Sequence, residues 1–293
     1  MTSTVSGLVT VPLVRALRTT VRDVATHYVE AGSGPPLILV HGGGPGASGP
    51  SGWERLLPLL AVDHRVIALD LIGCGDTDKP LVDYSFQTLV EHLAGFIDVL
   101  GLDRVRLVGN SQGAYVAIKY ALDHPGRVDA AVLLSTGTLA TAVGIGDGGY
   151  AGSLPAFDGT AATMRAFLEF IVKDAALVTD ELVERRLEIA MRPGHREMLA
   201  SLGRYRQLVN ADSSQRQVFD VRERLEHLGV PWCSIWASDD RLAPLDPFGR
   251  ALQQLYPNAP FFVVDDAGHQ VQTDQPDQTA RLIRDFLHAQ QEE

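Results

Sequence analysis

The sequence has little cysteine, no long hydrophobic run and fewer basic than acidic residues. Its 293 residues include only two cysteines, Cys74 and Cys233, so we expect no structural disulfide and a reducing compartment, the cytoplasm. No run of about 18 apolar residues is present, which predicts no membrane span. Residues 1–6 lack the basic and apolar regions of a signal peptide. The net charge of −11 disfavours nucleic acid and anionic membranes as partners.

Motifs of several common chemistries are also missing. The sequence has no HExxH motif, no P-loop and no GxGxxG after a strand, so we expect no metal and no cofactor. A small-molecule substrate is the expected partner. The apolar content of 45% and the chain length allow one large core, or a core with an inserted subdomain.

The most informative stretch of the sequence is Gly-Asn-Ser-Gln-Gly at residues 109–113. It follows a predicted buried strand, Val105–Val108, and precedes a predicted helix, residues 114–121. Such a strand–turn–helix unit resembles the nucleophile elbow of α/β-hydrolases, in which a serine is held in strained geometry with its hydroxyl exposed above the sheet. Ser111 is therefore the predicted nucleophile.

Strands and helices alternate along most of the chain, which predicts a mostly parallel sheet covered by helices on both faces. Together with the resemblance of residues 109–113 to a nucleophile elbow, this implies an α/β-hydrolase fold. Further strands are predicted at 26–30, 37–40, 65–69, 130–134, 232–236 and 261–264, and helices at 86–100, 248–255 and 278–289.

Residues 137–228 break this pattern and predict a helical cap inserted in a core formed by residues 1–136 and 229–293. Helices are expected at 163–173, 179–191 and 197–209, with no strand of the main sheet. The glycine-rich stretch at 144–149 is either a mobile entrance loop, over about residues 144–152, or an ordinary long loop.

A serine nucleophile needs a base and a carboxylate that orients the base. In α/β-hydrolases the chain order of the three is serine, acid, histidine. Asp240 and His269 each directly follow a predicted strand, where open α/β sheets place their sites. Asp239 is the alternative acid, although we expect it to face solvent or to pair with Arg241. The other downstream histidines, at 195, 227 and 288, are expected to be solvated.

The oxyanion of a tetrahedral intermediate needs two backbone N–H donors. One is predicted at Gln112, directly after the nucleophile. The second is predicted at Gly43, with Gly42 and Gly44 as neighbouring substrate contacts, because glycines let backbone approach a substrate closely. His41 is expected to anchor this loop without carrying protons.

With these motifs the chain resembles the meta-cleavage product hydrolases within the α/β-hydrolase superfamily. These enzymes cleave a carbon–carbon bond in the vinylogous 1,5-diketones formed by ring cleavage of aromatic compounds. The resemblance rests on residues 41–47, 109–111, 238–241 and 268–269, and its aspartate spacing before Pro244 favours Asp240. It implies that Arg186 holds the dienoate carboxylate and that Asn110 binds the 2-oxo end.

Both implied substrate contacts have structural alternatives. Arg186 could lie on a solvated helix face with i,i+4 charge pairs, and Asn110 could only stabilise the elbow. Gln270, directly after His269, is also a predicted substrate contact, although the family usually has tryptophan there. The sequence departs from the family again at Gln112–Ala114, where methionine and a second glycine are usual. An asparagine expected shortly after Trp53 is missing too.

These departures leave the substrate open. The alternative to a C–C hydrolase is an ester or lactone hydrolase for a small aromatic or polyketide-like substrate, in which Ser111 forms an acyl-enzyme. A non-hydrolytic binding protein, or a lyase or cyclase, on the same scaffold is a second alternative. The resemblance implies a possible homodimer or higher homo-oligomer, although no interface stripe stands out in the sequence.

Overall fold

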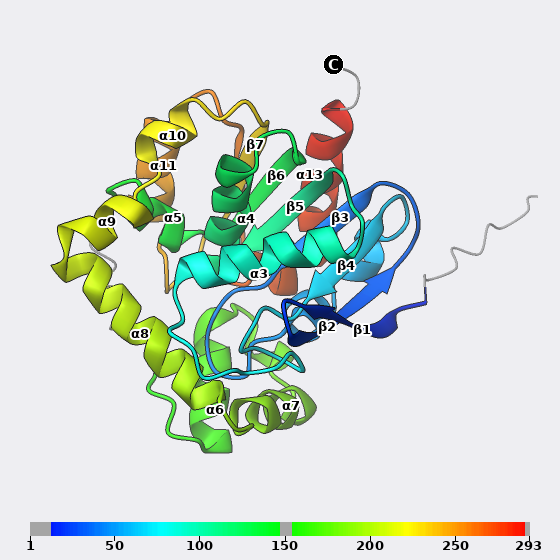
Figure 1. Ribbon diagram of the computed structural model, residues 1–293, viewed down its shortest axis with the longest axis vertical. Helices are drawn as coiled ribbons and strands as arrows, with labels where there is room; N and C mark the ends of the chain where they lie inside the picture. The colour runs from blue at the N-terminus through cyan, green and yellow to red at the C-terminus, as the bar shows by residue number, and fades with distance from the viewer. Residues whose placement is uncertain (1–12, 147–153, 291–293) are drawn as a thin grey trace, which may run out of the picture.

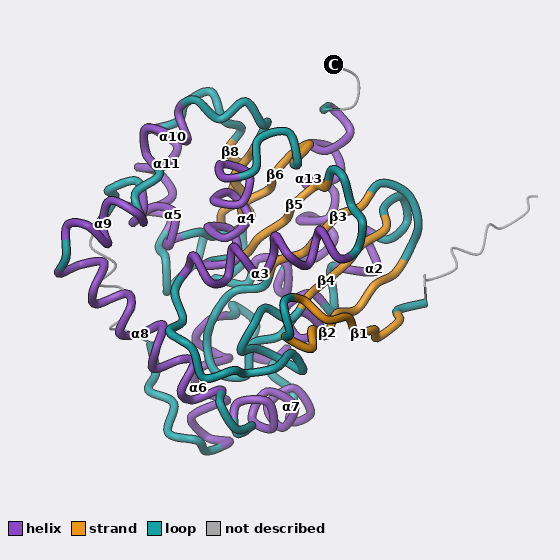
Figure 2. Tube along the Cα trace, in the orientation of Figure 1, coloured by secondary structure: helices purple, strands orange, loops and turns teal. Residues whose placement is uncertain are grey.

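The computed structural model describes residues 13–146 and 154–290, and within them the chain builds one eight-stranded sheet (Figures 1 and 2). The strand order is β1-β2-β4-β3-β5-β6-β7-β8. The pairs β1–β2 and β2–β4 are antiparallel. All other neighbouring pairs, in the order β4-β3-β5-β6-β7-β8, are parallel. The strands span β1 Arg15–Val21, β2 Val24–Ala31, β3 Pro36–Val40, β4 Arg65–Leu69, β5 Val105–Asn110, β6 Val128–Leu134, β7 Trp232–Ala237 and β8 Phe261–Val264.

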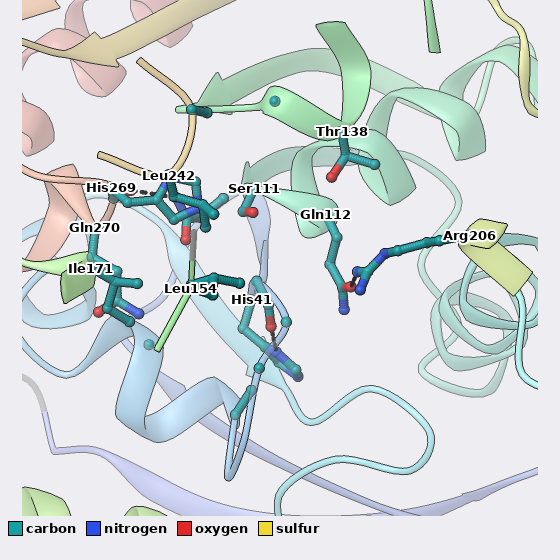
Figure 3. Close-up of a pocket in the computed structure, with 18 of the residues that line it drawn as sticks. His41, Ser111, Gln112, Thr138, Leu154, Ile171, Arg206, Leu242, His269 and Gln270 are labelled. Carbon is teal, nitrogen blue, oxygen red and sulfur yellow. Dashed lines mark hydrogen bonds between the residues drawn. The ribbon is translucent and has the colours of Figure 1, made fainter. Parts of the chain in front are cut away.

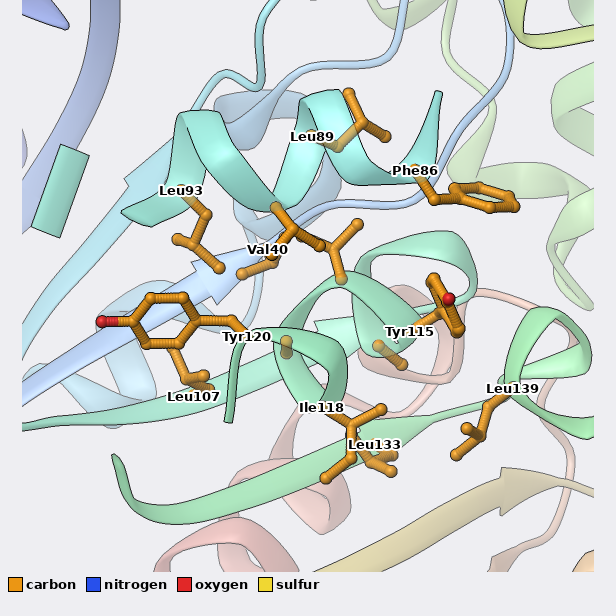
Figure 4. Close-up of a cluster of buried hydrophobic side chains, with 14 of the residues drawn as sticks. Val40, Phe86, Leu89, Leu93, Leu107, Tyr115, Ile118, Tyr120, Leu133 and Leu139 are labelled. Carbon is orange, nitrogen blue, oxygen red and sulfur yellow. The ribbon is translucent and has the colours of Figure 1, made fainter. Parts of the chain in front are cut away.

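Helices cover both faces of the sheet, which explains why the central strands are nearly continuous apolar runs. In β3, Ile38 and Val40 pack towards one face, with α3 (Phe86–Val99) and α4 (Gln112–Asp123), as Figure 4 shows for Val40. Leu37 and Leu39 pack towards the other, with α1 (Gly49–Trp53), α2 (Leu57–Leu60), α12 (Val271–Asp274) and α13 (Pro276–Ala289). The alternation follows the two-residue period of a strand.

The predicted fold class is confirmed, but β1 was not predicted. Its sequence, Arg-Ala-Leu-Arg-Thr-Thr-Val, has four polar residues and no continuous apolar run, and the strand lies at the sheet edge with six of its seven residues at least partly exposed. It therefore carries only a weak strand signal. The helix predicted at 248–255 begins earlier, as a π-helical turn, η3 (Leu245–Gly249), followed by α11 (Arg250–Leu255).

The segment between β6 and β7 consists of helices and connecting loops, with no strand in its described part. It contains α5 (Gly137–Ala142), α6 (Ala161–Ile171), the 3₁₀ turn η2 (Ala175–Leu177), α7 (Asp180–Ala190), α8 (His195–Ala211), α9 (Ser213–Phe219) and α10 (Arg222–Glu226). The three predicted cap helices correspond to α6, α7 and α8. In Figure 1, α6 and α7 lie at one end of the molecule, and α8 runs from them towards α9.

The cap has a small apolar core of its own. Met164, Phe167, Leu168, Ile171 and Val183 pack together, apart from the two clusters that flank the sheet. By contrast, α5 packs against α4 and η3. Residues 147–153 of the predicted entrance loop lie outside the described residues.

Across the described residues, no helix is both long enough and apolar enough to cross a membrane.

Candidate active site

A cavity of about 240 Å³ lies where the cap meets the carboxyl ends of the central strands (Figure 3). Nine of the ten predicted site residues line it: Gly42, Gly43, Gly44, Asn110, Ser111, Gln112, Arg186, His269 and Gln270. The tenth, Asp240, is buried and hydrogen-bonded to the ring of His269. Residues from five distant parts of the sequence therefore meet in one cavity.

Ser111 sits on a strained turn between β5 and α4. Its φ of 56° and ψ of −123° lie in a region of backbone conformation that residues other than glycine rarely adopt. Its backbone N–H donates to the carbonyl of Leu134 at 2.9 Å. A Cβ on Gly109 would lie 2.5 Å from Ala114, and one on Gly113 would lie 2.2 Å from the Val40 carbonyl oxygen. Only glycine fits at both positions, so the G-x-S-x-G pattern follows from packing.

His269 and Asp240 form a buried pair. The Nδ1 of His269 lies 2.9 Å from Oδ2 of Asp240, and Oδ1 of Asp240 accepts the N–H groups of Leu242 at 2.9 Å and Ala243 at 2.8 Å. These contacts fix the carboxylate and orient the imidazole. The Nε2 of His269 is buried without a hydrogen-bond partner among the described residues. It is thus the ring atom left to exchange a proton with a group in the cavity.

Asp239 is placed differently from its neighbour. Its carboxylate lies 2.5 Å from Nζ of Lys173, and this ion pair lowers the pKa of Asp239 below its usual value. Of the two alternatives for Asp239, the structure favours exposure to solvent, since 37% of its side chain is exposed, while Arg241 donates to the carbonyl groups of Glu169 and Val172. Asp240 is therefore the acid in contact with His269.

The glycine loop after β3 lies directly against the elbow. A Cβ on Gly42 would come 3.2 Å from Cβ of Ser111, and one on Gly43 would come 2.7 Å from Oε1 of Gln112. Beneath the loop, His41 accepts the Leu71 N–H at Nε2, at 3.1 Å, and its Nδ1 lies 2.7 Å from the Gly42 carbonyl. Burial lowers the pKa of His41, so the ring is neutral and serves as an anchor.

Arg186 is almost fully buried, with 2% of its surface exposed, so the solvated-face interpretation is wrong. Its Nη1 donates to Oγ of Ser51 at 3.3 Å, whereas Nε and Nη2 have no partner among the described residues. Burial lowers the pKa of Arg186 to about 10, which still leaves it charged at neutral pH. A buried cation with two unused donors is suited to bidentate binding of a carboxylate.

Asn110 and Gln270 line the cavity but have partners. The Nδ2 of Asn110 donates to the carbonyl groups of Leu134 at 3.3 Å and His269 at 3.1 Å, so both amide hydrogens hold the elbow to the histidine loop. This arrangement favours the elbow-stabilising alternative for Asn110. The side-chain oxygen of Gln270 accepts a hydrogen bond from the Thr273 hydroxyl at 3.1 Å. Its backbone N–H donates to the carbonyl of Ile171, in the cap, at 3.0 Å.

Comparison with known sequences assigns the chain to a family. A profile described as "alpha/beta hydrolase fold" matches residues 35–276. The chain belongs to the α/β-hydrolase family. It is 35% identical, over 91% of its length and 94% of the relative's, to a 2-hydroxy-6-oxo-2,4-heptadienoate hydrolase from Pseudomonas putida. It is 32% identical to a 2-hydroxy-6-oxononadienedioate/2-hydroxy-6-oxononatrienedioate hydrolase from Paraburkholderia xenovorans, over 98% of this chain and 99% of that one.

Solved structures agree with the sequence comparison. The crystal structure of a meta-cleavage product hydrolase from Pseudomonas fluorescens superimposes with a TM-score of 0.79 at 30% identity, covering 93% of this chain and 98% of the other. The predicted resemblance is thus confirmed: this α/β-hydrolase is similar to the meta-cleavage product hydrolases.

One expectation about the histidines of this α/β-hydrolase is wrong. His195 is fully buried at the start of α8, where its Nε2 accepts the Gly46 N–H at 3.0 Å and its Nδ1 lies 3.1 Å from the Gly73 carbonyl. Burial lowers its pKa to about 4. The residue ties the cap to the glycine loop, a contact between segments so distant in sequence that no local pattern could indicate it.

Sequence reasoning also missed Arg206, which lines the cavity and donates to Oε1 of Gln112 at 2.8 Å. In the sequence it is one of several arginines of α8, and nothing there separates it from Arg196 or Arg204.

Three side chains outside the cavity, those of His27, Asp70 and Asp76, have ligand atoms within 4.8 Å of one another. All three are engaged in protein contacts. Asp70 binds the Nδ1 of His27 at 2.7 Å and the Gly49 N–H at 2.6 Å, and Asp76 pairs with Arg192. The group therefore organises the loop after β4 and the start of α1.

Proposed function

We propose that this α/β-hydrolase is a serine-type enzyme that cleaves the carbon–carbon bond of vinylogous 1,5-diketone ring-fission products. The observation that carries the proposal is the buried Arg186, whose Nε and Nη2 lack partners among the described residues in the cavity that Ser111 and His269 also line. An ester hydrolase has no general need of such a cation. A dienoate substrate has a carboxylate for it to bind.

In this proposal each side chain has one role. His269, oriented by Asp240, removes a proton from Ser111 or from a water molecule, and the N–H groups of Gly43 and Gln112 stabilise the oxyanion. Arg186 holds the dienoate carboxylate. The cap, which contributes Arg186 and Phe167, closes the substrate in the cavity.

The reaction consumes one water. The dienol first takes its keto form, which makes the leaving carbon a stabilised carbanion equivalent. Ser111 or water then adds to the distal carbonyl, the adjacent carbon–carbon bond breaks, and its electron pair leaves as the dienolate, which takes up a proton. If Ser111 attacks, water delivered by His269 hydrolyses the acyl-enzyme, so the acyl part leaves as a carboxylic acid in either route.

The test compares a coloured ring-fission product with p-nitrophenyl esters and lactones. We expect loss of the substrate colour with the wild-type protein, at a much higher kcat/KM than for any ester, and at least a thousandfold lower kcat for Ser111→Ala and for His269→Ala. Turnover of esters or lactones alone would favour the alternative hydrolase. Wild-type activity in either variant would refute the assignment of the site.

Binding without catalysis is tested separately. A fluorophosphonate should label Ser111 of the folded protein, because the serine is activated by the His269–Asp240 pair. No adduct, together with no turnover of any of these substrates, would favour a binding protein. If the fluorophosphonate does not label Ser111, but the protein turns over a substrate and loses this activity in His269→Ala, the protein would be a lyase or cyclase.

A further inference from the structure

The charge of the cavity is opposite to that of the chain. The protein carries a formal charge of −11, yet the described residues that line the cavity include two arginines, Arg186 and Arg206, and no aspartate or glutamate. A site lined by one sign of charge concentrates ligands of the other sign. The dienoate carboxylate of the proposed substrate pairs with Arg186 and leaves Arg206 without an anion to bind.

The two arginines belong to different walls of the cavity. Arg186, from α7, contacts Ser51 of α1. Arg206, from α8, donates to the Gln112 side chain at the start of α4, and its guanidinium carbon lies 5.6 Å from the ring centroid of Phe86 at the start of α3. Figure 3 shows Arg206 and Gln112 meeting on one side of Ser111, with His269 and Gln270 on the other.

Arg206 has no acidic partner among the described residues. Its guanidinium contacts a neutral amide oxygen and an aromatic ring. As a whole the residue is solvent-exposed, while the protein around its guanidinium lowers its pKa. Both observations are explained if the guanidinium faces the open cavity, where it is accessible to solvent and also surrounded by protein. Desolvating a cation without a counter-charge costs free energy, and an incoming anion would recover it.

Apart from Gln112 and Asn210, the side chains that α3, α4, α8 and α9 contribute to the cavity beside Arg206 are apolar. Phe86, Leu199, Val209 and Phe219 line the cavity with it. Such a wall suits a short methylene chain that ends in a charged group, because the chain packs on the apolar side chains and the charge reaches the guanidinium.

We propose that Arg206, positioned by Gln112, binds a second carboxylate of the substrate, on the acyl side of the bond that breaks. The substrate is then a diacid: one carboxylate lies on the dienoate at Arg186 and the other ends the acyl chain. This inference rests on the proposed function and extends it. Arg206 is accordingly the residue that sets specificity for the acyl part.

The experiment measures kcat/KM for two ring-fission substrates that differ in the acyl end: 2-hydroxy-6-oxohepta-2,4-dienoate, a monoacid, and 2-hydroxy-6-oxonona-2,4-dienedioate, a diacid. We expect the wild type to prefer the diacid and Arg206→Met to lower the diacid-to-monoacid ratio about 10- to 100-fold, mainly through KM, as for loss of a charge-assisted hydrogen bond. Arg206→Lys should keep part of the preference. Arg204→Met, on the same helix but outside the cavity lining, should keep the wild-type ratio.

Several outcomes would overturn the inference. Wild-type preference for the monoacid, or an equal loss on both substrates in Arg206→Met, would show that Arg206 has only a structural role, while the proposed C–C hydrolysis would stand. If the wild type cleaves neither substrate, the proposed function fails, and equilibrium binding of both compounds by Ser111→Ala decides about the subsite. Tighter binding of the diacid that depends on Arg206 would support it, and equal or absent binding would refute it.

Discussion

The carboxylate of Asp274 accepts the backbone N–H of Lys173 with both of its oxygens, each at 3.0 Å. The same carboxylate accepts the N–H of Gly268 at 2.8 Å, directly before His269. One side chain thus joins the end of cap helix α6 to the loop that carries the predicted base. The position of His269 depends on the cap as well as on the sheet.

Asp274→Ala should therefore impair catalysis as well as stability. Loss of these hydrogen bonds should lower the free energy of unfolding by about 1 kcal/mol and lower kcat about tenfold, because a small displacement of a catalytic group is costly. Urea denaturation and steady-state kinetics on the best substrate measure both effects. Asp285→Ala, on the exposed face of α13, is the control. A kcat equal to wild type would contradict the coupling.

Much of this arrangement could be predicted because it depends on local patterns. The strands at 37–40 and 105–108 are short apolar runs, and the elbow is bracketed by a strand and a helix. Asp240 and His269 both follow strands that end at the same edge of the sheet. Strand order then brings these segments together without further information.

The remainder depends on contacts between distant segments. The burial of Arg186 and His195 follows from how α7 and α8 pack on the glycine loop, and helix periodicity alone left Arg186 equally suited to solvent. The edge strand β1 is held by backbone pairing with β2, which is independent of side-chain polarity. Arg206 differs from other arginines of α8 only in what it faces.

The two adjacent aspartates provide a matched pair of variants. Asp240→Asn would place an amide N–H₂ or a weaker acceptor against Nδ1 of His269, which disturbs the tautomer, and kcat should fall about 100- to 10,000-fold. Asp239→Asn loses the partly exposed ion pair with Lys173 and weakens the hydrogen bond that Ser238 donates, neither of which contacts His269, so it should change kcat less than about threefold. The same kinetic assay compares the two. Equal effects would mean that the acid has been assigned to the wrong residue.

Neighbouring arginines of α7 provide a second pair. Arg186→Met removes a buried cation that has two unused donors, so kcat/KM should fall at least about tenfold while the free energy of unfolding stays equal or rises. Arg185, which pairs with Glu54 at 2.6 Å, is the control, and Arg185→Met should leave kcat/KM near wild type. Thermal unfolding and kinetics together test the claim. A large loss of stability in Arg186→Met would indicate a structural role for the guanidinium.

Acid should destabilise the fold through its buried histidines. Burial lowers the pKa of His92 and His195 to about 4, and that of His41 is also lowered, against about 6.5 for an unfolded histidine. Between these two pKa values the unfolded chain binds more protons than the folded one. The contribution of these histidines to the free energy of unfolding is therefore fully present above about pH 6.5 and is lost as the pH drops towards 4. His92 and His195 each contribute at most about 3 kcal/mol to this loss. Urea denaturation between pH 7.5 and 4.5 measures it.

The contribution of one histidine can be isolated with His195→Gln. Glutamine can still accept the Gly46 N–H but does not titrate in this range, so the variant should lose less stability between pH 7 and pH 5 than the wild type does. His227→Gln, the same substitution at an exposed histidine, is the control. If the His195→Gln profile has the wild-type slope, acid sensitivity arises elsewhere and the neutral ring at the cap–loop contact is not its source.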